Sequence, residues 1–374
     1  MRTWLEIDLG ALEQNLNAFR ALTGTPVMAV LKSNAYGHGL SLCAGALRPD
    51  WLGVNSLEEA KSAREAGAGA PLLVMGPVDP ADFSELAGLA CTIVVSNRSE
   101  IEALPQGQAF HLKVDTGMSR LGHHGAALDS IFEYLASNSQ LNWTGLMTHF
   151  ANVEDVTDQE FAAQQLAAFH ASRQKARKAA GSRSLLCHSA ASGAAILLPE
   201  SRMDLVRIGI SMYGLWPSRE TKISASTLIA RGDLKKDFIL KPALSWITRV
   251  AHLNRVSAGS SIGYGCTYRP IQETLVAVLP VGYFEGYDRR LSSKAHVLVR
   301  GMRAPVIGRV CMNMIMIDVT HVTGITPGDP VVLIGSSGTE QITAEDLAGW
   351  MGTINYEVVS RIEGNLPRIA LKRN

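Results

Sequence analysis

The feature that most constrains the fold of this chain is a regular alternation of short apolar runs with helical stretches. It begins after a helical pattern over residues 12–22 and continues to about residue 207. Strands separated by helices pair in parallel, so they build either a closed barrel or an open doubly wound sheet. No Gly-x-Gly-x-x-Gly turn follows the first strand, which favours a (β/α)8 TIM-like barrel. The eight predicted strands lie near 27–31, 51–54, 71–75, 91–95, 109–114, 143–148, 184–188 and 204–207.

The pattern changes near Leu240-Lys-Pro-Ala243, where a second, mainly β domain begins. Helical periodicity is weak beyond this point except around 343–352, and Gly and Pro interrupt the apolar runs. We predict a barrel over 9–238 and a C-terminal mainly-β domain over 239–374, to which residues 1–8 are added. The β-branched runs are Val250-Ala-His-Leu253, Leu275-Val-Ala-Val-Leu279, Val297-Leu-Val299 and Val331-Val-Leu-Ile334.

Composition and charge exclude several classes of function. The net charge is only +1, so nothing indicates binding to nucleic acid or to an anionic membrane. No apolar run approaches the roughly 20 residues of a membrane span, and the N-terminus does not resemble a signal peptide. The five cysteines are scattered, and the ten histidines show no metal-binding spacing. We therefore expect a cytoplasmic protein without a metal.

Lys32 is the first candidate for chemistry. It follows the apolar run Pro26-Val-Met-Ala-Val-Leu31 and precedes a turn rich in Asn and Gly. An amine where a strand leaves the core is suited to Schiff-base formation, because burial lowers its pKa and frees the attacking lone pair. Barrel active sites lie at the carboxyl ends of the strands. Other reactive side chains follow the predicted strands to the same rim: Asp115 to Arg120 after the fifth, His149 closing the sixth, Ser189 to Ser192 after the seventh, and Arg207 closing the eighth.

The string Lys32-Ser-Asn-Ala-Tyr-Gly-His-Gly39 resembles the pyridoxal-phosphate (PLP) lysine segment of the alanine racemases. The resemblance covers essentially the whole chain. It implies an isomerase that exchanges L- and D-alanine by two-base proton transfer on a PLP aldimine and supplies D-alanine for peptidoglycan. The other matching segments, in order, are Trp4-Leu-Glu-Ile-Asp-Leu9, Lys113-Val-Asp-Thr-Gly-Met-Ser-Arg-Leu-Gly122, Thr148-His-Phe-Ala151, Arg207-Ile-Gly-Ile-Ser-Met-Tyr-Gly214, Ser261-Ile-Gly-Tyr-Gly265, Pro280-Val-Gly-Tyr283, Gly308-Arg-Val-Cys-Met312 and Tyr356-Glu-Val358.

The resemblance implies two catalytic residues, Lys32 and Tyr264, on opposite faces of the substrate carbon. Lys32 would also hold PLP, and Tyr264 would act from the second subunit of a head-to-tail homodimer. Arg207 would face the pyridine nitrogen, with His149 bridging Arg207 and Tyr264. The implied cofactor-binding residues are Lys32, Tyr36, His149, Ser192, Arg207, Gly209, Ile210 and Tyr356.

The resemblance also implies a substrate site made by Arg120, Met312 and Tyr283. Lys113 is a lysine that the family often carries as a carbamate, where it positions Arg120. Simpler interpretations stay open for several of these residues. They are Tyr36 and Tyr356 as packing residues, Ser192 as a helix cap, Lys113 as the ion-pair partner of Asp115, and Tyr264 as a turn residue of the β domain.

Two departures from the family pattern affect the choice of substrate. Ala191 stands where the family usually has Asn, and Asn313 stands where it usually has Asp. A serine, lysine or broad-specificity racemase on the same scaffold is therefore an alternative. A non-catalytic PLP-binding protein and a barrel decarboxylase are alternatives of other classes, but the segments around Tyr264, Tyr283 and Met312 favour a racemase.

Overall fold

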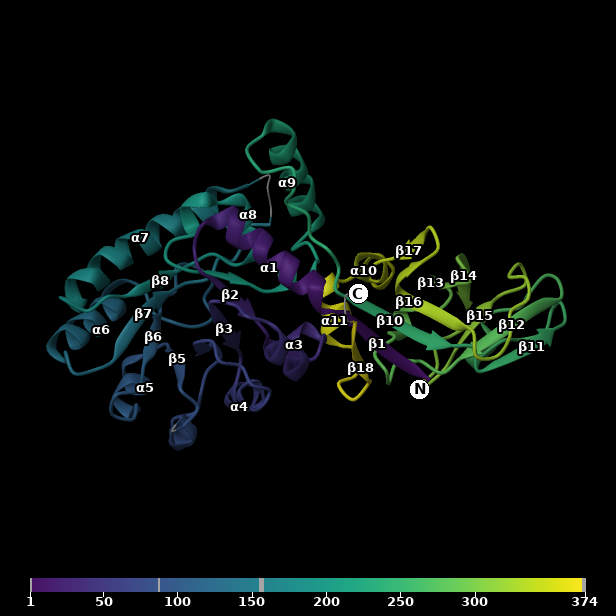
Figure 1. Cartoon of the computed structure of the whole chain (residues 1–374), viewed down its shortest axis with the longest axis horizontal. Helices are drawn as coiled ribbons and strands as arrows, with labels where there is room; N and C mark the ends of the chain where they lie inside the picture. The colour runs from purple at the N-terminus through teal and green to yellow at the C-terminus, as the bar shows by residue number, and fades with distance from the viewer. Residues whose placement is uncertain (1, 87, 155–157, 372–374) are drawn as a thin grey trace. The chain divides into compact units, whose positions relative to one another are not determined.

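The computed structural model describes residues 2–86, 88–154 and 158–371 (Figure 1). The chain forms two compact units. One comprises Ala11–Ala35 and Cys43–Pro242, and the other Met1–Gly10, Tyr36–Leu42 and Ala243–Asn374. None of the helices in the described ranges combines the length and apolar character that a membrane span requires.

The first unit is built on an eight-stranded parallel sheet in the order β8-β7-β6-β5-β4-β3-β2-β9. β9 lies beside β2, so the last strand in sequence meets the first, as in a barrel. Two backbone hydrogen bonds span the remaining gap, from Asp204 N to Cys187 O at 3.1 Å and from Arg207 N to Ala190 O at 3.0 Å. The strands are β2 (Val27–Val30), β3 (Trp51–Val54), β4 (Leu72–Val74), β5 (Cys91–Val95), β6 (Phe110–Lys113), β7 (Trp143–Met147), β8 (Leu186–His188) and β9 (Val206–Ile208).

Helices cover the outside of these strands (Figure 1). The strands are almost wholly buried because a parallel sheet is covered on both faces, which explains their apolar runs. The helices are α1 (Leu9–Thr23), α3 (Leu40–Ala46), α4 (Leu57–Glu65), α5 (Arg98–Ala103), α6 (Gly125–Ser137), α7 (Glu160–Ala180), α8 (Ser192–Leu197) and α9 (Arg219–Arg231), with short 3-10 turns η1 (Pro80–Leu86), η2 (Pro199–Ser201) and η3 (Ile210–Tyr213).

The predicted barrel is confirmed, and each strand lies within about two residues of its predicted position. One placement was wrong. Arg207 does not close the last strand but occupies the middle of β9. Its side chain is 3% exposed, so it belongs to the barrel interior rather than to a loop. This difference matters for the site described below.

The second unit is a ten-stranded sheet in the order β11-β12-β15-β14-β13-β16-β10-β1-β18, with β17 paired to β16. The predicted mainly-β domain is thus confirmed. β1 (Thr3–Asp8) pairs antiparallel with β10 and parallel with β18, so the N-terminal strand is part of this sheet. The other strands are β10 (Leu244–Arg249), β11 (His252–Val256), β12 (Thr274–Leu279), β13 (His296–Val299), β14 (Met302–Ile307), β15 (Ile315–Asp318), β16 (Pro330–Ser337), β17 (Glu340–Ile342) and β18 (Arg368–Leu371).

Two segments of this unit, 343–352 and 250–253, can be compared with what the sequence indicated. The helix expected around 343–352 is α10 (Ala344–Met351), which has a capping box between Thr343 and Asp346 and ends at Gly352 with φ +70°. The β-branched run Val250–Leu253 does not form a single strand, because only His252 and Leu253 belong to β11. Val250 and Ala251 form the break between β10 and β11, where their amides donate to Asp329 O and Val278 O.

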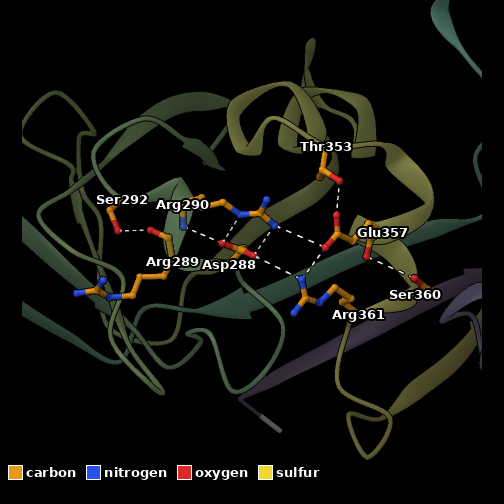
Figure 2. A network of polar contacts seen from close by, with 8 residues as sticks. All are labelled: Asp288, Arg289, Arg290, Ser292, Thr353, Glu357, Ser360 and Arg361. Carbon is orange, nitrogen blue, oxygen red and sulfur yellow. Dashed lines mark hydrogen bonds and ion pairs between the residues drawn. The ribbon is translucent and has the colours of Figure 1, made fainter.

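The short helix α11 (Asn355–Ser360) is fixed by charged side chains (Figure 2). Arg361 lies 2.6 Å from Glu357, and Arg290 lies 2.9 Å from Asp288 and 3.7 Å from Glu357. Thr353 also donates its hydroxyl hydrogen to Glu357. These partly exposed pairs are individually weak, but together they join α11 to the turn η5 (Arg289–Leu291).

Candidate active site

Lys32 lies just beyond β2, at the carboxyl end of a barrel strand. Burial lowers the pKa of its amine, and the nearby cations of Arg120 and Arg207 lower it further, while Glu59 opposes them. A lowered pKa increases the fraction of neutral amine, which is the form that attacks a carbonyl carbon. The position and the electrostatics of Lys32 therefore both suit a nucleophilic amine.

Arg207 is held from several sides within the barrel. Its Nη1 donates to Nδ1 and to the carbonyl of His188, at 2.8 and 3.1 Å. Its Nη2 donates to the carbonyls of Thr148 and Ser189 at 2.8 and 2.9 Å and lies 3.3 Å from His149 Nδ1. Burial lowers the pKa of Arg207 to about 10, so it stays charged at neutral pH. Within the described part of the chain no acceptor contacts Nε, which leaves one N–H available to a ligand.

Two histidines that were not predicted as site residues support Arg207. His111 on β6 and His188 on β8 are fully buried, and His111 Nδ1 lies 2.9 Å from His188 Nε2. Burial lowers the pKa of both rings, and the charge of Arg207 adds to the effect. The signal was present in the sequence, since His111 lies between apolar residues of β6 and His188 ends the short strand β8. Their contact could not be predicted, because it depends on how the barrel closes.

Ser192 and Gly209 lie together at the ends of β8 and β9. The amide of Gly209 donates to Ser192 Oγ at 3.1 Å, and Ile210 follows as the first residue of η3. Ser192 is the first residue of α8 and does not cap it; the N-cap is Ala191, without a side-chain cap. The interpretation of Ser192 as a helix cap is therefore wrong, and its hydroxyl instead fixes the turn that begins η3.

Lys113 is the last residue of β6 and is 6% exposed. Burial lowers the pKa of its amine to about 7, and Arg207 and Arg120 lower it while Asp115 raises it. Asp115 Oδ1 instead accepts hydrogen bonds from the amides of Gly117 at 2.9 Å, Met118 at 2.9 Å and Ser119 at 3.1 Å. Asp115 therefore shapes the loop that leads to Arg120. No ion pair joins it to Lys113 in the described ranges.

The barrel site is strongly cationic. Lys32, Lys113, Arg120 and Arg207 all lower the pKa of His149, whose burial is the largest cause of its shift well below the usual value. Like charges gathered in a partly buried place are unfavourable unless an anion joins them. The site therefore fits a ligand that carries negative charge, such as a phosphate or a carboxylate.

The remaining predicted residues belong to the β unit. The rings of Tyr36 and Tyr356 lie 6.2 Å apart between centroids, and burial raises the pKa of Tyr36 to about 12. Tyr283 and Met312 are on adjacent loops, because Tyr283 N donates to Cys311 O at 3.1 Å and the next amide donates to Met312 O at 2.9 Å.

Several large side chains of this unit are exposed to solvent. Tyr264 is 71% exposed, in the turn η4 (Tyr264–Cys266). Tyr283 and Met312 are 43% and 54% exposed. Asn313 Nδ2 donates to Glu285 Oε1 at 2.7 Å, and Glu285 Oε2 accepts from Gly282 N at 2.7 Å. The family departure at 313 thus has a partner in the neighbouring loop.

Comparison with known protein families matches almost the whole chain. Residues 7–217 match the alanine racemase N-terminal domain, and residues 243–370 match the alanine racemase C-terminal domain. The alanine racemase of Leptospira interrogans serogroup Icterohaemorrhagiae serovar Lai is 42% identical over 382 residues, which cover 99% of this chain and 96% of that relative. The alanine racemase of Desulforamulus reducens is 38% identical over 383 residues, with 98% of each chain covered.

Solved structures show the same relationship. The alanine racemase from Bacillus anthracis with bound L-Ala-P superposes with a TM-score of 0.88 at 34% identity, covering 100% of this chain and 95% of that chain. The alanine racemase from D-cycloserine-producing Streptomyces lavendulae gives a TM-score of 0.89 at 32% identity, covering 100% and 98%. Both domains, their order and their fold agree, and the chain therefore belongs to the alanine racemase family.

Proposed function

We propose that this chain interconverts L-alanine and D-alanine with pyridoxal 5'-phosphate as cofactor, and that it supplies D-alanine for peptidoglycan. The observation that carries the proposal is the arrangement around Lys32. An amine of lowered pKa stands at a barrel rim beside Arg120 and Arg207, and Arg207 keeps one N–H without an acceptor among the described residues. PLP carries an aldehyde, a ring nitrogen and a phosphate. The site offers an amine for the aldehyde, an N–H donor for the nitrogen and positive charge for the phosphate.

PLP, when bound, supplies an electron sink that stabilises negative charge on the α-carbon. Lys32 would hold it covalently, and Ser192, Gly209 and Ile210 would bind its phosphate through a hydroxyl and backbone amides. Arg207 would donate Nε–H to the pyridine nitrogen. Because a guanidinium keeps its protons at neutral pH, that nitrogen would stay unprotonated and would draw less charge into the ring. The residues thus favour return of the proton to the α-carbon over side reactions.

Racemisation requires a proton to leave one face of the α-carbon and another to arrive on the opposite face. Lys32 Nζ would exchange the proton on one face. Tyr264 Oη of a second copy of the chain would exchange it on the other. The exposed fraction of Tyr264, 71%, supports this assignment, because a catalytic tyrosine that serves another subunit must be open to it. Tyr36 and Tyr356 would complete the cofactor site, with His149 between Arg207 and Tyr264.

The homodimer is part of the proposal. Tyr264, Tyr283, Phe284, Met312 and Met314 are large apolar or aromatic side chains that are all 43% exposed or more. Hydrogen bonds between the 283–284 and 311–312 backbones place Tyr283, Phe284 and Met312 on neighbouring loops, and Met314 O accepts from Cys311 N in the same loop as Met312. Exposed apolar surface of this kind is typical of an interface. Met312 and Tyr283 would then line the substrate site of the second subunit, opposite Arg120, which would bind the carboxylate.

A serine, lysine or broad-specificity racemase is the second candidate, and Asn313 is the observation that favours it. A neutral amide at this position removes a negative charge that the family usually carries. The test is D-alanine formation from L-alanine by the purified protein, with and without added PLP, compared with turnover of L-serine and L-lysine. We expect alanine first, serine about ten- to hundredfold weaker and lysine negligible, because extra side-chain bulk would overpack the pocket. Serine or lysine turned over as fast as alanine would contradict the alanine assignment.

The attachment site is tested separately. The purified protein should be yellow and lose its colour on borohydride reduction, with the label on the peptide that contains Lys32. A label on Lys113 or on any other lysine would contradict the assignment of Lys32.

A further inference from the structure

The segment that follows Lys32 has an unusual backbone. Ser33, Asn34 and Ala35 form a left-handed helical turn, with φ of 56°, 54° and 54° and ψ of 53°, 46° and 49°. None of the three is glycine, and left-handed helical backbone is unfavourable for L-residues because it brings Cβ too close to the following carbonyl oxygen. Such strain persists only where the surrounding structure enforces it, and it concentrates at functional sites.

Two hydrogen bonds enforce this turn. Ala35 N donates to Leu31 O at 2.7 Å, which closes the turn on itself. Ser33 N donates to Glu59 Oε1 at 2.6 Å, which ties the turn to the first residues of α4. Glu59 is thus a side chain from outside the turn whose carboxylate binds the turn's backbone.

Glu59 is itself held in place. Its other oxygen, Oε2, accepts from Asn55 N at 2.7 Å, and its backbone amide donates to Ser56 Oγ at 3.3 Å. Ser56-Leu-Glu-Glu59 has the Ser-x-x-Glu pattern of a capping box, in which Glu59 would bind the amide of Ser56. Only the Ser56 half of that motif is formed, and the carboxylate instead bridges Asn55, after β3, to Ser33, after β2. Ser56 alone therefore caps α4, and the Glu59 carboxylate binds backbone amides that follow β2 and β3 instead.

We propose that Glu59 is a positioning residue, whose carboxylate stabilises the strained turn Ser33–Ala35 and so keeps the Lys32 amine directed to its carbonyl partner. The inference rests on the proposed function, since it gives Lys32 an aldehyde to bind. In that step the Lys32 nitrogen forms a double bond to the aldehyde carbon, and the carbonyl oxygen leaves as water with two protons from nitrogen. Glu59 takes no part in the bond changes. Glu59 also raises the pKa of Lys32, whereas Arg120 and Arg207 lower it. Removal of the Glu59 carboxylate therefore changes both the geometry of the turn and the charge near the amine.

The test is the rate at which cofactor-free protein takes up PLP covalently at Lys32, measured by timed borohydride trapping and peptide mapping. Glu59→Gln leaves one acceptor for two amides and places an NH2 group against the other. We expect Glu59→Gln to take up PLP about tenfold more slowly than wild type, because it loses a charge-assisted hydrogen bond to the turn. Glu58→Gln is the matched control, because Glu58 lies in the same helical turn and does not contact Ser33. It should take up PLP at the wild-type rate.

A suppressor variant separates the role in the turn from general stability. Glycine adopts left-handed backbone without penalty, so Ser33→Gly should relieve the strain that Glu59 opposes. The Ser33→Gly/Glu59→Gln double variant should recover most of the uptake rate. Hydrogen exchange gives an independent readout, since the Ser33 amide should exchange at least about tenfold faster in Glu59→Gln than in wild type. If Glu59→Gln alone does not fold, the folded double variant carries the test.

The outcomes are distinct. Wild-type protein that takes up no PLP at Lys32 would overturn the proposed function, and this inference with it. If wild type takes up PLP normally and Glu59→Gln takes it up at the same rate, the role of Glu59 alone is overturned. The same holds if Glu58→Gln loses as much of the uptake rate as Glu59→Gln does. A folded double variant that keeps the full defect would also overturn it, because relief of strain would then have no effect.

Discussion

Arg207 Nη1 lies 2.8 Å from His188 Nδ1, and this contact fixes the protonation of a row of side chains inside the barrel. An arginine can only donate, so Nδ1 of His188 accepts and its proton is on Nε2. His188 Nε2 then donates to His111 Nδ1 at 2.9 Å, which places the His111 proton on Nε2. That last atom is buried without a partner among the described residues. Both rings are therefore neutral, and Arg207 holds the positive charge of the row.

The first prediction concerns the space around His111. Gly145 pairs with His111 across β6 and β7, and a Cβ added at Gly145 would lie 2.4 Å from His111 Cδ2. Gly145→Ala should therefore destabilise the protein by about 1–3 kcal/mol, as overpacked cores do. Urea unfolding followed by circular dichroism measures this loss. In a His111→Ala background the added cost should nearly vanish, whereas an equal cost in both backgrounds would contradict the predicted clash.

The second prediction is a loss of stability in acid. Burial lowers the pKa of His111 to about 3 and holds the pKa of His149 and His188 well below the usual value. Below about pH 6.5 these histidines bind protons in the unfolded chain but stay neutral in the folded chain. The free energy of unfolding therefore falls as pH falls. Each histidine contributes about 1.4 kcal/mol per pH unit while it stays neutral in the folded state, for His111 down to about pH 3.

Urea midpoints between neutral and acidic pH measure that slope. His111→Asn should reduce the slope by the share of one histidine. An unchanged slope would mean that His111 is already protonated in the folded protein.

The barrel could be predicted from the sequence because its strands are buried on both faces and so appear as apolar runs. The position of Lys32 followed from the same logic, since a strand end is marked by the change from apolar to turn residues. Three features could not be predicted. The left-handed turn at Ser33–Ala35 has no glycine to mark it. The bond between His111 and His188 joins residues 77 positions apart and exists only once the barrel closes. Arg207 looked like a strand end because charged residues seldom occupy strand centres.

The third prediction concerns Lys113. With a pKa of about 7, much of this amine is neutral at neutral pH and can add to CO2, forming an N–C bond and releasing a proton. The resulting carbamate would place a negative charge beside Arg120 and Arg207. We expect activity to fall by about tenfold or more in Lys113→Met and less in Lys113→Glu, which restores a carboxylate. Carbon-13 NMR of protein in labelled bicarbonate would detect the carbamate directly. No carbamate signal and equal losses in both variants would exclude it.

The fourth prediction concerns Asn313 and Glu285, which join the loops of Met312 and Tyr283. Asn313→Asp would set two carboxylates against each other where a 2.7 Å hydrogen bond now lies. We expect kcat/KM for alanine to fall by about tenfold. Adding Glu285→Gln should restore it, because the glutamine can donate to the new aspartate and still accept from Gly282 N. Failure of the double variant to recover would show that the charge at 313, rather than the bond, determines activity.

The last prediction tests whether one active site draws on two copies of the chain. Lys32→Ala and Tyr264→Phe should each be inactive alone, because every site in either dimer lacks one proton-exchanging group. In a mixed dimer both lesions fall in one site, and the other site is intact. Random pairing would make about half of the dimers mixed, so co-expression should restore about a quarter of the wild-type activity per subunit. The measurement is racemisation by the co-expressed mixture and by the doubly tagged, co-purified dimer, with each single variant as control. The co-purified sample contains only mixed dimers, so it should show about half of the wild-type activity per subunit. No recovery in a confirmed mixed dimer, or full activity of a wild-type monomer, would contradict a shared site.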